Sequence, residues 1–163
     1  MSENQLISAA FPNNISLYMK REDLLHPIIS GNKFRKLKYN LEEAKKQNQK
    51  VLLTFGGAFS NHIVAVAGAG ETFGFETVGI IRGEELHDKI SENPSLLQAQ
   101  QLGMKFVFIS REQYRLKEAA DFIEKLRKDY GEFYLLPEGG TNALAIKGCE
   151  EILTFEDKSE FSH

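Results

Sequence analysis

Short apolar runs alternate with amphipathic segments along the chain after residue 50. Each run is only a few residues long, is rich in aliphatic and aromatic side chains, and is followed by glycine, serine or proline, which is typical of buried strands. The expected strands are residues 51–55, 77–81, 105–109 and 133–136. The segments expected to be helices are residues 60–74, 93–103, 111–131 and 142–153. Strands that alternate with helices predict an α/β fold, with one open parallel sheet and flanking helices.

A further helix is expected before the first strand, over residues 31–46. Its apolar positions form one arc of the helical wheel, whereas most of its charged residues lie on the opposite side. Lys33 is the exception, because it projects beside Leu37 and Ala44 at the edge of the apolar arc. A lysine in this position usually keeps its amine in water, and the sequence alone leaves that interpretation open. The lysines of residues 33–50 are interrupted by acidic residues, which favours a solvated helix face. The polar tail, residues 154–163, carries no clear signal for a further element.

Composition and charge fit one ordinary globular domain. Of the 163 residues, 42% are apolar and 26% are charged, and the formal net charge is −3. This balance gives no sign of a nucleic-acid or membrane partner, and no segment reaches the roughly 20 apolar residues that cross a bilayer. The acidic N-terminal stretch does not resemble a secretory signal, so we expect a cytoplasmic protein. Cys149 is the single cysteine, which excludes an internal disulfide, and neither it nor the scattered histidines predict a metal site.

Two glycine-containing loops are the candidate binding elements. They are residues 56–62, after the first expected strand, and residues 137–142, after the fourth. In an open parallel sheet, ligands bind outside the carboxyl ends of the strands, and a helix start favours an anion such as a carboxylate. Taken alone, each loop is as well explained by a turn followed by a helix N-cap. His62, taken alone, is as well explained as a histidine buried in the core. The sequence contains no Walker motif, no H-E-x-x-H and no G-x-S-x-G, and its G-A-G-E-T-F-G lies inside an expected helix.

Four motifs occur together and in a fixed order. They are K-R-E-D (20–23), G-N-K-F-R-K-L (31–37), G-G-A-F-S-N-H (56–62) and P-E-G-G-T-N-A-L (137–144). This set resembles the pyridoxal-phosphate (PLP) enzymes that include 1-aminocyclopropane-1-carboxylate (ACC) deaminase and D-cysteine desulfhydrase. The family has the tryptophan-synthase β-like fold, known as fold type II. The resemblance extends from about residue 15 to about residue 153.

The resemblance implies a role for each motif residue. Lys33 would form the Schiff base with PLP, and partial burial beside apolar side chains would favour the lowered pKa that this requires. Asn61 would bind the phenolic oxygen of the cofactor. Ser60 would take part in catalysis, and Ser60, Asn61 and His62 would bind the substrate. The cleft would also be lined by the return loop, namely Gly139, Gly140, Thr141 and Asn142.

The resemblance also implies an activity. Members act on small amino acids, converting ACC to 2-oxobutyrate and ammonia, or D-cysteine to pyruvate, sulfide and ammonia. His62 is similar to the desulfhydrase branch, whereas the deaminases more typically have glutamine there. A full-length member is expected to be a homodimer. The alternative that the residues leave open is a non-catalytic α/β module that binds a small anionic ligand at the helix start after Ser60.

The resemblance divides the chain into three parts. Residues 1–47 would begin the large PLP domain, residues 48–138 would form the small domain, and residues 139–163 would return to the large domain. Family members are much longer, and their second half supplies the phosphate cradle, a partner for the pyridine nitrogen and a catalytic tyrosine. We therefore expect a truncated or partial family member, whose activity alone is open.

Overall fold

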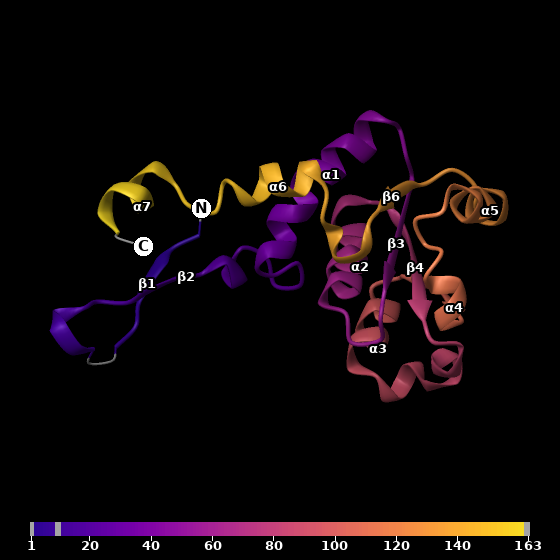
Figure 1. Cartoon of the computed structure of the whole chain (residues 1–163), viewed down its shortest axis with the longest axis horizontal. Coiled ribbons are helices and arrows are strands. Elements are labelled where there is room, and N and C mark those ends of the chain that lie inside the picture. Colours follow the sequence, from indigo (N-terminus) through magenta and orange to yellow (C-terminus); the bar gives the residue numbers. More distant parts are fainter. Residues whose placement is uncertain (1, 9–10, 162–163) are drawn as a thin grey trace.

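The computed structural model of the protein describes residues 2–8 and 11–161. Figure 1 shows a sheet with its covering helices on one side of the view and an extended arm, which carries both ends of the chain, on the other. Helices α1 (Asn32–Lys46) and α6 (Ala143–Cys149) lie between these two regions.

The sheet confirms the expected fold class. It has four strands in the order β5-β4-β3-β6, and every neighbouring pair is parallel. The strands are β3 (Val51–Gly56), β4 (Glu76–Arg82), β5 (Lys105–Ile109) and β6 (Tyr134–Leu136). Each lies within a residue or two of the run that predicted it, because strands covered on both faces by other elements read as continuous apolar segments, most clearly the buried β3 and β4.

Helices cover both faces of this sheet. The remaining helices are α2 (Asn61–Phe73), α3 (Pro94–Gln101), α4 (Arg111–Tyr114), α5 (Ala120–Tyr130) and α7 (Phe155–Glu160). The 3-10 helices are η1 (Pro12–Asn14), η2 (Glu22–Leu24), η3 (Glu84–Glu92) and η4 (Glu138–Gly140). Two adjacent residues of β3 belong to different core clusters, Leu52 with α1, α2 and α3, and Leu53 with α4 and α5. This alternation is the two-residue period of a strand.

The expected helix over residues 111–131 is wrong in one respect, because the structure divides it into α4 and α5. Ser110 and Gln113 form a capping box that starts α4, and Tyr114 is buried. The following backbone then closes tight turns, with amides of residues 115, 116, 117 and 119 donating to carbonyls three positions earlier. These turns redirect the chain before α5 begins.

The expected helix over residues 142–153 ends earlier, at Cys149, and the tail expected to carry no further element forms α7. Thr154 and Asp157 make a capping box at the start of α7. This T-x-x-D spacing is a recognised helix-start pattern and was the missed signal.

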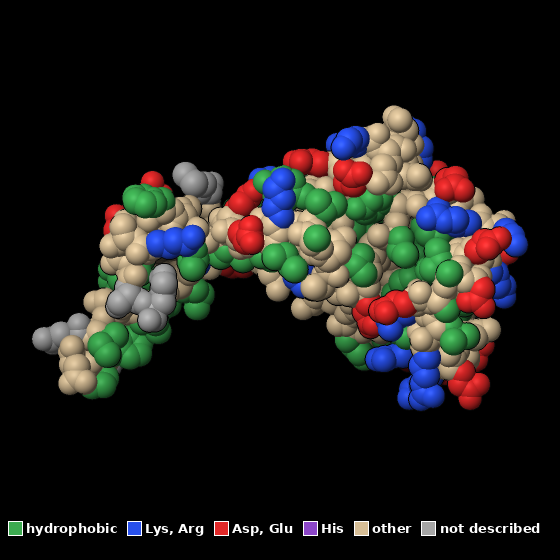
Figure 2. All heavy atoms as spheres, turned by 45° about the horizontal axis from the view of Figure 1, so that its top comes forward, with side chains coloured by type: hydrophobic (Ala, Val, Ile, Leu, Met, Phe, Trp, Pro, Cys, Tyr) green, Lys and Arg blue, Asp and Glu red, His purple; other side chains and the backbone are tan. Residues whose placement is uncertain are grey.

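The arm consists of the hairpin of β1 (Asn4–Leu6) and β2 (Tyr18–Lys20) with α7 against it. Asp157 of α7 links this helix to the hairpin, because it accepts hydrogen bonds from Asn4 Nδ2 at 2.5 Å and from Lys20 Nζ at 2.6 Å. Figure 2 shows apolar side chains on the surface of this arm. Those at least two-fifths exposed on the hairpin are Leu6, Ile15, Leu17, Tyr18 and Met19.

The side of α1 that was expected to be solvated is partly covered. Helix α6 packs there so closely that a Cβ atom on Gly148 would overlap the backbone carbonyl of Arg35. The Arg35 side chain is only 11% exposed and pairs with Glu22, with Nε 2.8 Å from Oε2. Over the described residues, no helix is both long and apolar enough to cross a membrane.

Candidate active site

The first turn of α1 positions Lys33. Gly31 precedes the helix as its N-cap with φ +60° and ψ −144°, a conformation that glycine adopts readily. The amide of Phe34 then donates to the Gly31 carbonyl at 3.2 Å. Lys33 is half-buried at the edge of the apolar stripe, where the sequence placed it, and Leu37 and Ala44 are buried beside it.

The Lys33 amine points toward the return loop that follows β6. Its Nζ atom donates a hydrogen bond to the carbonyl oxygen of Gly139 at 3.0 Å. Lys36, one turn later, donates to Thr141 Oγ1 at 2.7 Å and lies 3.4 Å from the same Gly139 oxygen. The structure thus brings two of the expected cleft residues, Gly139 and Thr141, to the lysines of α1.

Burial lowers the pKa of Lys33, and the neighbouring charge of Lys36 lowers it further. Both causes act in the same direction, because each disfavours the ammonium form. More of the Lys33 amine is therefore neutral at a given pH than for a lysine in water, and the neutral amine is the nucleophilic form.

The loop after β3 turns directly into α2. Ser60 is the N-cap, and its hydroxyl oxygen accepts a hydrogen bond from the amide of Ile63 at 3.4 Å. Gly56 is required at the end of β3, because a Cβ atom there would lie 2.5 Å from the Ile63 side chain. Asn61, the first residue of α2, is exposed.

Lys33 and Asn61 line the same cavity, which has a volume of about 450 Å³. Gly31 and Asn32 contribute the helix start, whereas Ser95 and Gln98 come from α3. Sequence reasoning missed the two α3 residues, although their spacing of three positions places them on one helix face. Ser60 does not line this cavity.

His62 lies in the core beneath the return loop. Its Nε2 is 2.8 Å from the hydroxyl oxygen of Thr54, whose own hydrogen goes to the Leu136 carbonyl at 3.0 Å, so Nε2 is the protonated nitrogen. Gly140 packs on the ring, and a Cβ atom at Gly140 would lie 2.9 Å from Cε1. Burial, followed by the charges of Lys33 and Lys36, lowers the pKa of His62 to about 3. The ring is neutral, and its expected contact with substrate stays a prediction.

The side chain of Asn142 forms hydrogen bonds that hold the fold together. Its Oδ1 caps α6 by accepting from the Ala145 amide at 2.9 Å, and its Nδ2 donates to Asn40 Oδ1 at 2.7 Å. Tyr134 donates to the same Asn40 oxygen at 3.0 Å. This partly buried network fixes the return loop to α1, and so positions Gly139 near Lys33.

The residues around Lys33 fit the aldehyde end of PLP. Lys33, whose pKa is lowered, and the exposed Asn61 line one polar cavity. Among the described residues, no group of three or more His, Cys, Asp or Glu is placed to hold a metal ion.

Several known proteins are similar in sequence to most of this chain. A putative ACC deaminase of Thermotoga maritima is 40% identical over 136 residues, which are 82% of this chain and 42% of that protein. A bifunctional D-cysteine desulfhydrase/ACC deaminase of Arabidopsis thaliana is 34% identical over 148 residues, 86% of this chain and 36% of that protein. A D-cysteine desulfhydrase of Serratia proteamaculans is 25% identical over 134 residues, 81% of this chain and 41% of that protein. No protein-family model matches.

The fold comparison covers more of the chain. A crystal structure of an ACC deaminase homologue matches 99% of this chain and 49% of its own, with a TM-score of 0.75 and 26% identity. The chain spans less than half the length of the relatives and the structure that it matches. These similarities agree with the order of the motifs and with the parallel sheet, and they show that the chain belongs to the ACC deaminase/D-cysteine desulfhydrase family.

Proposed function

We propose that this chain provides the lysine side of a PLP site in an enzyme that removes ammonia from a small amino acid. The candidate substrates are ACC and D-cysteine, on which the named relatives act. The observation that carries the proposal is that the half-buried Lys33 lines a cavity together with Asn61, while its amine lies 3.0 Å from the Gly139 carbonyl.

When bound, PLP withdraws electrons from the substrate Cα and stabilises negative charge there. Lys33 Nζ would hold the cofactor and accept or return a proton, since its lowered pKa favours the neutral amine. Asn61, which lines the same cavity, would bind the phenolic oxygen of the cofactor. The free amides at the start of α2, after Ser60, would attract the substrate carboxylate.

We further propose that residues 48–138 act as the small domain and that the flanking segments belong to the large one. Two contacts support this division. Gly148 of α6 lies against Arg35 of α1, and Asp157 of α7 is bonded to Asn4 and Lys20 of the hairpin. The segments before and after the sheet therefore pack on one another (Figure 1).

Cofactor attachment tests the role of Lys33. The full chain and the variants Lys33→Ala and Lys46→Ala are mixed with PLP, reduced with borohydride and digested, and the modified peptide is located by mass spectrometry. We expect PLP on Lys33 in the unmodified chain and in the Lys46 control, which removes an exposed lysine of the same helix. Equal labelling of the Lys33→Ala variant, or labelling spread evenly over the surface lysines, would contradict the proposal.

Activity is measured separately. Ammonia with 2-oxobutyrate is assayed from ACC, and ammonia with pyruvate and sulfide from D-cysteine. Specific attachment at Lys33 without product would limit this chain to cofactor binding. Product from one substrate that disappears in Lys33→Ala would identify the reaction.

A further inference from the structure

A second cavity lies at the carboxyl ends of the strands. It has a volume of about 630 Å³, and none of its lining residues lines the Lys33 cavity. Its walls come from the segments that follow β3, β4 and β5, together with Glu138 after β6. This is the edge where open parallel sheets bind ligands, so its position alone makes it a candidate site.

The charge of this cavity is unbalanced. Four cationic side chains and two carboxylates line it, namely Arg82, Arg111, Arg115, Lys117, Glu85 and Glu138. The two carboxylates are engaged, Glu85 with Arg111 at 3.3 Å and Glu138 with Lys117 at 3.5 Å. Arg82 and Arg115 form no ion pair within the described residues, so the lining carries two uncompensated positive charges.

Tyr114 supplies a hydrogen-bond donor without a partner. Its side chain is 3% exposed and packs edge-on against Phe55, with ring centroids 6.0 Å apart. Among the described residues, its buried hydroxyl has no hydrogen-bond partner. Buried polar groups are nearly always satisfied in native proteins, and Tyr114 lines the cavity, so its hydroxyl is available to a bound ligand. Burial raises the pKa of Tyr114, and so does the Glu138 carboxylate, which lies near the hydroxyl but beyond hydrogen-bonding distance, so the phenol stays protonated and able to donate.

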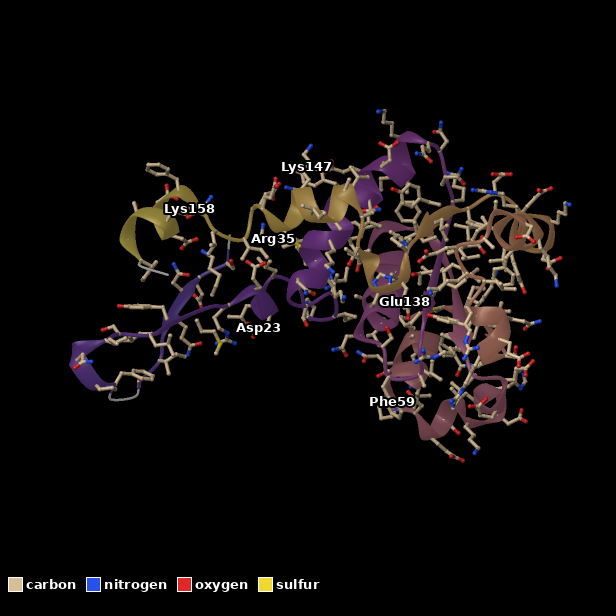
Figure 3. All side chains as sticks on the ribbon, in the orientation of Figure 1. Asp23, Arg35, Phe59, Glu138, Lys147 and Lys158 are labelled. Atoms are coloured by element: carbon tan, nitrogen blue, oxygen red, sulfur yellow. The ribbon has the colours of Figure 1, made fainter. Side chains whose placement is uncertain are left out.

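Two of the four cationic side chains lie near the ring of Tyr114. The Arg82 guanidinium carbon is 5.5 Å from the Tyr114 ring centroid, and Lys117 Nζ is 5.3 Å from it. Gly57 lies beside the same arginine, since a Cβ atom there would be 3.6 Å from Arg82 Nη2. Phe59 is 78% exposed in the lining, and Figure 3 shows that it and Glu138 come from different loops. The charged groups and the donor therefore share one cavity that is open to solvent.

We infer that this cavity binds a small oxyanion with two negative charges, held by Arg82 and Arg115 and by a hydrogen bond from the Tyr114 hydroxyl. A planar guanidinium donates two parallel hydrogen bonds to a phosphate or a carboxylate, which suits this class of ligand. The inference does not depend on Lys33 or on the proposed activity.

Binding is tested by calorimetric titration of the full chain at constant ionic strength. Inorganic phosphate and succinate represent the two sources of a doubly charged oxyanion, and acetate is the singly charged control. We expect saturable binding of phosphate or succinate, at least tenfold tighter than that of acetate. The ligand that binds more tightly shows whether the natural oxyanion is a phosphate or a dicarboxylate.

Three variants locate the site. Arg82→Gln with Arg115→Gln should weaken binding at least tenfold, and because both side chains are exposed, the fold should be retained. Arg127→Gln removes an equally charged side chain on α5, outside this cavity, and should leave binding unchanged. Lys33→Ala should also leave it unchanged, which separates this site from the proposed PLP site. Absence of saturable binding, or equal weakening by Arg127→Gln, would overturn the inference.

Discussion

The Nζ atom of Lys33 lies 3.0 Å from the carbonyl oxygen of Gly139, although 106 positions separate the two residues. The contact exists because Asn142, three residues after Gly139, is bonded to Asn40 in the middle of α1. The return loop thus closes over the first turn of α1 and limits the exposure of the amine. A chain that lacked this contact would leave Lys33 with its amine in water, which is the usual state of such a lysine.

Removal of the Lys36 charge should raise the pKa of Lys33. Lys36→Met keeps most of the side-chain length, and since Lys36 lowers the pKa of Lys33, the midpoint should move up toward 10.5. The pH dependence of acylation at each lysine, followed by mass spectrometry, measures that midpoint. Lys38→Met is the matched control, because Lys38 pairs with Glu151 instead of the return loop. A Lys33 midpoint at or above 10.5 in the unmodified chain would contradict the burial that the structure gives it.

The free energy of unfolding should depend on pH because of His62. Its pKa is about 3 when folded and about 6.5 in an unfolded chain, so between these values the unfolded state binds more protons. The buried, neutral His62 ring therefore has its full effect on stability above pH 6.5. Below pH 6.5 the free energy of unfolding falls by about 1.4 kcal/mol for each pH unit. Urea unfolding at pH 5 and pH 7 gives the total change, and His62→Gln should reduce it. A His62 ring that protonates near pH 6 in NMR spectra of the folded chain would refute the prediction.

The sheet was predictable because its two central strands, β3 and β4, are buried on both faces. Val51–Gly56 and Glu76–Arg82 are largely continuous apolar runs, so they can be recognised without an alternation of apolar and polar residues. The position of β6 beside β3 was not predictable in the same way, since strand order depends on long-range packing. The hairpin was missed for a different reason: Asn4–Leu6 and Tyr18–Lys20 are short and mostly exposed, so neither carries an alternating pattern.

The candidate site was predictable only as far as its motifs extend. Lys33 was found from its position on the helical wheel, and its neighbour Asn61 from the resemblance. Ser95 and Gln98 were missed because they lie on a helix with no motif, and only the packing of α3 beside α2 brings them to the cavity. The cationic cavity was missed because Arg82 and Arg115 are separated in sequence and line one cavity only once the sheet has formed.

Substitution of Gly148 by alanine should destabilise the protein, although alanine is the better helix former. In an exposed helix the change should stabilise by about 1 kcal/mol. Here the added Cβ would overlap the Arg35 carbonyl, so α6 must move away from α1, and such overpacking costs about 1–3 kcal/mol. Ile146→Ala is the control, because Ile146 is 56% exposed on the same helix, and it should change the free energy of unfolding by less than about 0.5 kcal/mol. Urea unfolding gives both values, and hydrogen exchange should show faster exchange of α6 amides in Gly148→Ala alone. A stabilised Gly148→Ala variant would mean that α6 does not lie on α1, and the return loop would then lose its hold on Lys33.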